Sequence, residues 1–250
     1  MRIATVIGRK FGRVFGFRMG VAALAFAGLM APSAKAGMTF VLPSGSTAGS
    51  LPVDATATFS ISAGVVHITL TNLLANPSGD IQTINGLQFV LSSGQTTGTL
   101  TSSSAIHRTI ASNGTFTDQG SSSTTWNLNS SVNDGAGAGI ELTSIGNSGG
   151  APTLIGLADS GNIYSAANGS IAGSKSHNPF LAGTATFDVN LSGLSASATI
   201  NSVYFEFGTA SGTNVAAVPA VVPEPSTIVM TTLGLGALGL IRLRQKATKA

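Results

Sequence analysis

The strongest catalytic pattern in the chain is a glycine-rich serine motif. Residues 146–150 read Gly-Asn-Ser-Gly-Gly, which fits the G-x-S-x-G pattern of serine hydrolases and would make Ser148 the nucleophile. Because the chain contains 32 Gly, such a match arises readily by chance. We therefore interpret the motif as a surface turn, and keep a secreted hydrolase with Ser148 as nucleophile as an alternative function.

The three histidines, His67, His107 and His177, indicate neither a metal centre nor a catalytic base. They are far apart in the sequence and lack the H-x-H or H-x-x-x-H spacing that places two imidazoles on one face of a strand or helix. His67 and His107 also lack the small neighbours of the catalytic histidine in trypsin-like proteases. Since His67 alternates with apolar residues, we expect it on the outer face of a strand. We predict no metal and no cofactor.

The acidic residues are scattered, and no pair suggests the two carboxylates of a glycosidase. Two segments, Asp159-Ser160-Gly161-Asn162 and Asn133-Asp134-Gly135, place oxygen ligands beside a tight turn, as calcium loops do. Neither has the alternating ligands and the distal Glu of an EF-hand loop. We interpret both as turns, in which Asn and Asp are common, and leave a calcium requirement open.

The distribution of charge excludes a role in binding nucleic acid. The chain carries 12 Lys+Arg against 9 Asp+Glu. Most of the basic residues lie near the two ends, so residues 37–225 keep only Arg108 and Lys175 against all 9 acidic residues. An acidic body repels the phosphate backbone of DNA and RNA. The chain also has no Cys, which excludes disulfides and thiol catalysis.

Residues 1–36 are typical of a secretory signal peptide. A basic stretch that ends at Arg18 is followed by an uncharged apolar run over residues 19–31. As a helix this run would be about 20 Å long, too short to span a bilayer. Ala34 and Ala36 are small residues at the two positions that signal peptidase reads, which predicts cleavage before Gly37. We therefore predict export through the Sec translocon and removal of this segment by signal peptidase.

Near the C-terminus, residues 226–241 form a second uncharged and largely apolar segment. Basic residues follow it directly: Arg242, Arg244 and Lys246. An apolar helix with a basic flank is the stop-transfer pattern in the positive-inside orientation. Two prolines just before the segment prevent a helix from continuing upstream. We predict a short transmembrane helix over 226–241, joined to the body by a linker over 208–222.

Pro223-Glu224-Pro225, the apolar segment and the short basic tail occur in the order of the PEP-CTERM sorting signal, and residues 223–250 resemble it. The resemblance implies an exosortase that processes the chain near Pro-Glu-Pro, in a Gram-negative bacterium that makes biofilm or exopolysaccharide. It also implies a precursor anchored in the inner membrane and a mature form at the cell surface or outside the cell. Pro223, Glu224 and Pro225 are then the recognition residues. An ordinary single-span anchor with a Pro-rich stalk is the alternative.

Between the two end segments, residues 37–207 show the period-2 alternation of half-buried strands. Runs of alternating apolar and Ser/Thr residues are separated by Gly, Asn, Ser and Pro, and helical periodicity is nearly absent. The expected elements are a hairpin over 56–71 and strands over 87–91, 104–111, 124–128, 140–145, 153–157, 184–191 and 199–207. We predict an all-β fold: one antiparallel β-sandwich of jelly-roll type, with hydroxyl-rich and almost uncharged outer faces.

These features together predict an exported cell-surface or extracellular-matrix protein that is not an enzyme. We expect a structural or adhesive role in exopolysaccharide or biofilm. Besides the secreted hydrolase, a carbohydrate-binding module is an alternative, and it requires exposed aromatic side chains on one sheet face. The amphipathic aromatic candidates for that role are Trp126, Tyr164 and Tyr204.

Overall fold

The computed structural model describes residues 37–220, apart from residues 63, 134, 136, 147–150 and 174–176. The predicted signal peptide, the predicted sorting segment and Ser148 lie outside the described residues. Within those residues the fold is all-β, and its only helix is the short 3-10 turn η2 (Asp80–Gln82). No helix in this part of the chain is long and apolar enough to cross a membrane.

The strands, in chain order, are β1 (Met38–Val41), β2 (Thr47–Ala48), β3 (Leu51–Pro52), β4 (Ala55–Ser62), β5 (Val65–Asn72), β6 (Ile84–Leu91), β7 (Thr99–Ile110), β8 (Phe116–Ser122), β9 (Asn127–Val132), β10 (Gly139–Thr143), β11 (Leu154–Ile155), β12 (Phe180–Asn190), β13 (Ile200–Phe207), β14 (Asn214–Ala216) and β15 (Val218–Pro219).

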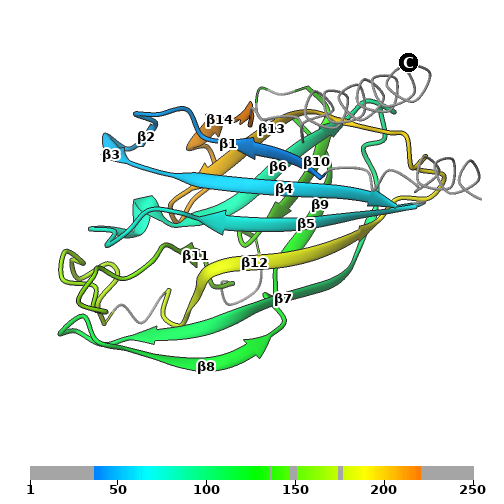
Figure 1. Cartoon of the computed structure of the whole chain (residues 1–250). Coiled ribbons are helices and arrows are strands. Elements are labelled where there is room, and N and C mark those ends of the chain that lie inside the picture. The colour runs from blue at the N-terminus through cyan, green and yellow to red at the C-terminus, as the bar shows by residue number, and fades with distance from the viewer. Residues whose placement is uncertain are drawn as a thin grey trace, which may run out of the picture. The chain divides into compact units, whose positions relative to one another are not determined.

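One hydrogen-bonded sheet contains 13 of these strands, and β2 and β3 form a separate pair. The large sheet has two arms, one behind the other in Figure 1. The first arm has the order β14-β13-β6-β10-β9, and the second has the order β15-β1-β4-β5-β12-β7-β8. The short strand β11 joins the arms, because it pairs in parallel with β12 and, through Leu154, with Ile84 of β6.

The all-β prediction is confirmed, but the predicted β-sandwich of jelly-roll type is replaced by a curled open sheet. A sandwich has two separate sheets, whereas here the hydrogen-bonded ladder continues from one arm to the other through β11. The parallel pairing of β11 with β12 also departs from a purely antiparallel fold. β11 lies within the strand predicted over residues 153–157, but the sequence pattern did not indicate that it pairs with strands of both arms.

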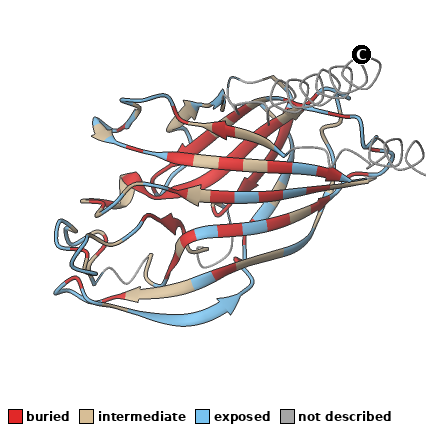
Figure 2. Ribbon diagram, viewed as in Figure 1, coloured by how far each residue is buried: buried red, intermediate tan, exposed pale blue. Residues whose placement is uncertain are grey.

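Alternation of side chains decides which face of each strand is buried. In β4 and β5, Ala, Phe, Ile, Leu and Val66 point inward, while Ser, Thr, His and Val65 point outward. Figure 2 shows this alternation of buried and exposed residues along both strands. Because a shift of one residue would reverse every side chain, the apolar pattern fixes the register of the hairpin.

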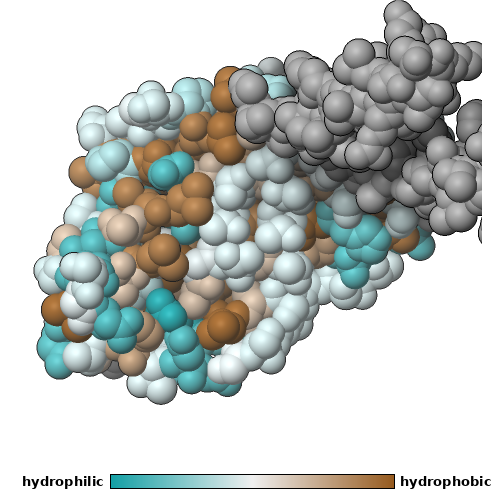
Figure 3. Space-filling view, viewed as in Figure 1, coloured by the Kyte–Doolittle hydropathy of each residue, from teal (hydrophilic) through white to brown (hydrophobic). Residues whose placement is uncertain are grey.

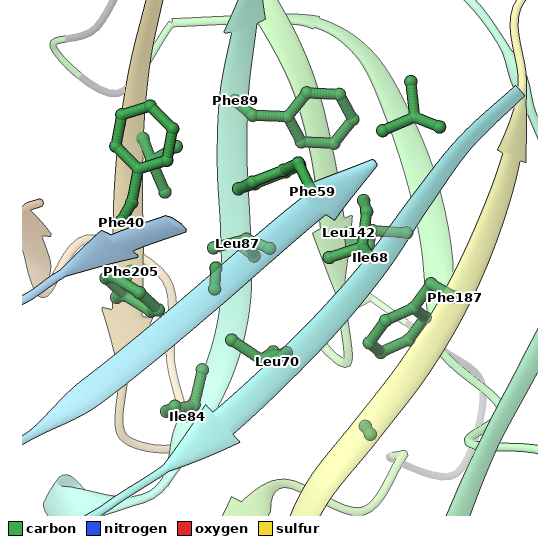
Figure 4. Packing of buried hydrophobic residues seen from close by; sticks show 14 of the residues in the cluster. Phe40, Phe59, Ile68, Leu70, Ile84, Leu87, Phe89, Leu142, Phe187 and Phe205 are labelled. Carbon is green, nitrogen blue, oxygen red and sulfur yellow. The ribbon is translucent and has the colours of Figure 1, made fainter. Parts of the chain in front are cut away.

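The core lies between the two arms and is built around phenylalanine rings (Figure 4). Phe59 of β4 is fully buried and lies 5.5 Å, centroid to centroid, from Phe89 of β6 in the opposite arm. The ring of Phe59 also packs against that of Phe40 of β1, and the two centroids are 5.8 Å apart. Near the other end of the same core, Trp126 packs at 5.3 Å from Phe187 of β12. These contacts hold the two arms face to face.

The segment predicted as a linker, residues 208–222, contributes the strands β14 and β15. β14 pairs with β13 in the first arm, and β15 pairs with β1 in the second arm. The amide of Ala217 donates to the carbonyl of Val203 (3.0 Å), and the amide of Ala220 donates to the carbonyl of Thr39 (2.8 Å). We call residues 214–220 the clasp, because they cross from the edge of one arm to the edge of the other.

Replacing Phe59 with Ala should lower the free energy of unfolding by about 3–5 kcal/mol, since it leaves a cavity at the contact between the arms. Urea unfolding followed by the fluorescence of Trp126, the single Trp in the chain, measures the change. Ser60→Ala, at the next residue on the exposed face, is the control and should change stability by less than about 0.5 kcal/mol. Equal losses in the two variants would contradict this account of the core.

Candidate functional site

The outer face of the second arm is lined with hydroxyl groups, as the sequence predicted. Cross-strand hydroxyl pairs join β1 to β4 (Thr39 and Thr58, 3.1 Å) and β5 to β12 (Thr71 and Thr184, 3.1 Å). A further pair joins β7 to β8 (Ser104 and Ser121, 2.6 Å). Figure 3 shows many pale atoms of near-neutral hydropathy on the side of the molecule that this view presents.

Four polar residues form one hydrogen-bonded chain on this face. His67 of β5 lies directly opposite Asp188 of β12, and its Nδ1 is 2.6 Å from the Asp188 Oδ1 atom. The Nε2 atom of the same ring is 3.2 Å from the Ser62 hydroxyl at the end of β4. The Ser102 hydroxyl of β7 donates to Asp188 Oδ2 at 2.7 Å. We call these residues the His67 cluster.

The His67 cluster is open to solvent, and hydrogen bonds keep its carboxylate ionised. The side chains of His67 and Asp188 are 48% and 41% exposed. Hydrogen bonds from Ser102 and then from His67 lower the pKa of Asp188, so its carboxylate stays ionised and acts only as an acceptor. The sequence predicted His67 on an outer strand face, which is confirmed. It did not predict the partner carboxylate, which is 121 residues away in the sequence.

A second polar cluster surrounds Arg108 of β7. The guanidinium group donates two hydrogen bonds to the Asp118 carboxylate (2.6 and 2.8 Å) and one to the Tyr164 hydroxyl (3.0 Å). It also lies over the ring of Phe116, 3.8 Å from the centroid. Tyr164 in turn donates to the carbonyl of Gly156. These bonds tie the β7–β8 hairpin to a neighbouring loop, which is a structural role for the cation.

In the two segments that resemble calcium loops, side-chain oxygens accept hydrogen bonds from nearby backbone amides, and Asp134 lies outside the described residues. The Asp159 carboxylate accepts hydrogen bonds from the Ser165 hydroxyl and from the amides of Ile163 (3.1 Å) and Gly161 (2.8 Å), and these bonds, the one from Ser165 most, lower its pKa. In the same way, Oδ1 of Asn133 accepts hydrogen bonds from the backbone amides of Gly135 and Gly137. Among the described residues, no group of three His, Cys, Asp or Glu side chains is placed to hold a metal ion.

Two of the three aromatic candidates for carbohydrate binding are buried. Trp126 is 4% exposed, and its indole N–H donates to the carbonyl of Pro152. Tyr164 is 1% exposed and bonded within the Arg108 cluster. Tyr204 is partly exposed. The described residues therefore do not present these rings together as a stacking platform for sugars.

The predicted first residue of the mature protein and the last described residue lie at the same edge of the sheet. Gly37, the predicted first residue of the mature protein, is exposed and directly precedes β1. β15 pairs antiparallel with β1, and Ala220 bonds to Thr39, so the start and the end of the body lie side by side. Ala34 and Ala36 lie outside the described residues.

Comparison with known families concerns the residues that follow the clasp. Residues 221–246 match the model of the PEP-CTERM protein-sorting motif. The chain carries a PEP-CTERM sorting motif. It is therefore an exported protein that is sorted through an exosortase, with a membrane-anchored precursor and a form at the cell surface. No curated protein and no solved structure matches the chain.

The PEP-CTERM motif starts immediately after the last hydrogen-bonded residue of the clasp, Ala220. Six residues that the sequence assigned to the sorting segment lie outside the described residues: Pro223, Glu224, Pro225, Arg242, Arg244 and Lys246.

Replacing Asp118 with Asn should lower the free energy of unfolding at neutral pH by about 0.5–1 kcal/mol, because it removes a partly exposed ion pair. The hydrogen bonds from Arg108 lower the pKa of Asp118, so their stabilisation is present at neutral pH and is lost as pH falls through the folded-state pKa. The difference between wild type and variant should therefore shrink below about pH 4. Urea unfolding from pH 7 to pH 3 measures it, and a difference independent of pH would contradict the assignment.

Proposed function

We propose that the protein is exported by the Sec translocon, trimmed by signal peptidase, and processed near Pro223-Glu224-Pro225 by an exosortase-like membrane enzyme. The processed body then serves as a structural or adhesive component of the cell surface, in contact with exopolysaccharide or biofilm matrix. The observation that carries the proposal is the PEP-CTERM match at residues 221–246, directly after a folded all-β body.

The position of Gly37 supports removal of a signal peptide before this residue. The first strand, β1, begins at Met38, so cleavage there would leave the complete sheet in the mature protein. A cut further along the chain would remove residues of β1 that pair with both β4 and β15. Cleavage before Gly37 is therefore compatible with an intact fold.

The polar character of the body supports contact with a neutral polymer. An open groove of about 350 Å³ lies where β7 begins and β12 ends, and amide, hydroxyl and backbone groups line it: Gln95, Thr97, Gly98, Thr99, Asn190 and Ser192. Uncharged donors and acceptors of this kind match the hydroxyl groups of a sugar chain. The buried positions of Trp126 and Tyr164 favour this mode over a carbohydrate-binding module that stacks sugars on aromatic rings.

Glu224 is the residue whose loss should affect sorting most, since it is the charged group between two prolines. Glu224→Ala should reduce the processed form at the cell surface and in the medium, and the uncleaved chain should accumulate in membranes. Intact-mass spectrometry of both fractions distinguishes a species from Gly37 to the Pro-Glu-Pro region from one that retains 226–250. Glu224→Gln separates the effect of charge from that of size. Normal processing of Glu224→Ala would refute the assignment.

Binding of the processed protein to exopolysaccharide from its host should persist at high salt. The proposed contacts are hydrogen bonds from uncharged groups, which salt screens little, whereas binding between charges weakens strongly as salt increases. Co-sedimentation at about 0.05 and 1 M NaCl tests this, with dextran as a control polymer. Loss of binding at 1 M would show that charge carries the contact, and no binding at either salt would refute the matrix role.

A further inference from the structure

Two neighbouring rows of residues cross the outer face of the second arm. In the first row, His67 of β5 and Asp188 of β12 are paired, and Asp188 pairs with Ser102 of β7. In the second row, Ser62 of β4 pairs with Val65, and Val65 pairs with Asn190 of β12. The hydrogen bond between Ser62 and His67 connects the two rows diagonally.

Each hydrogen bond of the His67 cluster can be assigned a donor and an acceptor. Because the Asp188 carboxylate only accepts, Nδ1 of His67 carries the hydrogen and donates it to Oδ1 at 2.6 Å. In the neutral ring, Nε2 then carries the lone pair, which accepts the hydroxyl hydrogen of Ser62 at 3.2 Å. Ser102 holds the second carboxylate oxygen at 2.7 Å and so fixes the orientation of the acid.

We propose that Ser62 is an activated nucleophile, with His67 as its general base and Asp188 as the group that orients the base, and that it reacts with carboxylic esters carried by neutral carbohydrate. A hydroxyl bonded to an imidazole that is itself held by a carboxylate is the arrangement that makes serine nucleophilic in unrelated folds. The proposal goes beyond sorting and adhesion, and it replaces the expectation that the body is not an enzyme. The assignment of the nucleophile and its base does not depend on the proposed function. Only the assignment of carbohydrate as the carrier of the ester rests on it.

The substrate class follows from the groove beside the cluster. Asn190 lines the groove and lies in the same cross-strand row as Ser62, two strands away. Adjacent strands are about 4.8 Å apart, so the two residues are separated by about 10 Å, the length of one or two sugar units. A sugar held by the amide and hydroxyl groups of the groove would place an ester substituent near Ser62. The open face admits a long polymer, which a closed pocket would exclude.

The reaction is balanced without a metal or a redox partner. The Ser62 oxygen forms a bond to the ester carbonyl carbon while its proton passes to Nε2 of His67. The bond from that carbon to the alcohol oxygen breaks, and the alcohol leaves with the proton from Nε2. Water then attacks the acyl group on Ser62 and gives a proton to Nε2, and this proton returns to the serine oxygen as the carboxylic acid leaves.

Labelling of the full chain with a fluorophosphonate probe tests the nucleophile without any polysaccharide. Peptide mass spectrometry should find the phosphonyl group on Ser62, and Ser62→Ala should abolish this label and the hydrolysis of p-nitrophenyl acetate. His67→Gln should slow both reactions at least about 100-fold, the usual contribution of a general base. Ser60→Ala is the matched control, because Ser60 is on the same strand and face and lies opposite His67, and it should change either rate less than twofold.

Three results would overturn the proposal. An unlabelled Ser62, or labelling that is equally fast in His67→Gln, would show that the histidine does not activate the serine. Release of acetate from p-nitrophenyl acetate but not from an O-acetylated neutral polysaccharide would refute the substrate class. The fluorescence of Trp126 reports whether each variant is folded, and Asp188→Asn provides a second variant that keeps both the serine and the histidine. It should also slow labelling, since it removes the acceptor that orients the ring.

Discussion

The contact between Phe59 and Phe89 is the interaction on which the rest of the structure depends. The two rings come from different arms of one sheet and meet 5.5 Å apart in the middle of the core. Burying them requires each arm to turn its apolar face toward the other, and strict alternation then places the remaining side chains of every strand on the outside. The hydroxyl face and the His67 cluster are therefore consequences of how the core is packed.

The parts of the fold that the sequence predicted are those in which apolar and polar residues alternate over a full strand. The hairpin of β4 and β5 and the strands β10, β12 and β13 belong to this class. For β6 and β7 the sequence predicted only the later residues, within 87–91 and 104–111. β8 escaped prediction because six of its seven residues are exposed, so no apolar alternation marks it. β11 lies within the strand predicted over residues 153–157, but its pairing, like that of the clasp, depends on strands far away in the sequence and was not predicted.

The same physical reason limits what the sequence could say about the candidate site. A local pattern singled out Ser148, because glycine-rich motifs are visible in a run of five residues. The His67 cluster has no local pattern, since strand pairing brings Asp188 to His67 across 121 residues of sequence. The signal that existed was weaker: a histidine on the outer face of a strand among serines and threonines. In contrast, the PEP-CTERM motif is contiguous, and the sequence alone was enough to identify it.

The clasp also joins the two ends of the body to each other. β1 is the first strand of the described body and β15 is the last. Phe40 pairs with Pro219 and Val41 with Val218, contacts that close one of the longest loops available to the chain. The edge of β1 can be covered only by residues that directly precede the sorting motif. The sheet is therefore incomplete in any shorter piece of the chain that ends before residue 218.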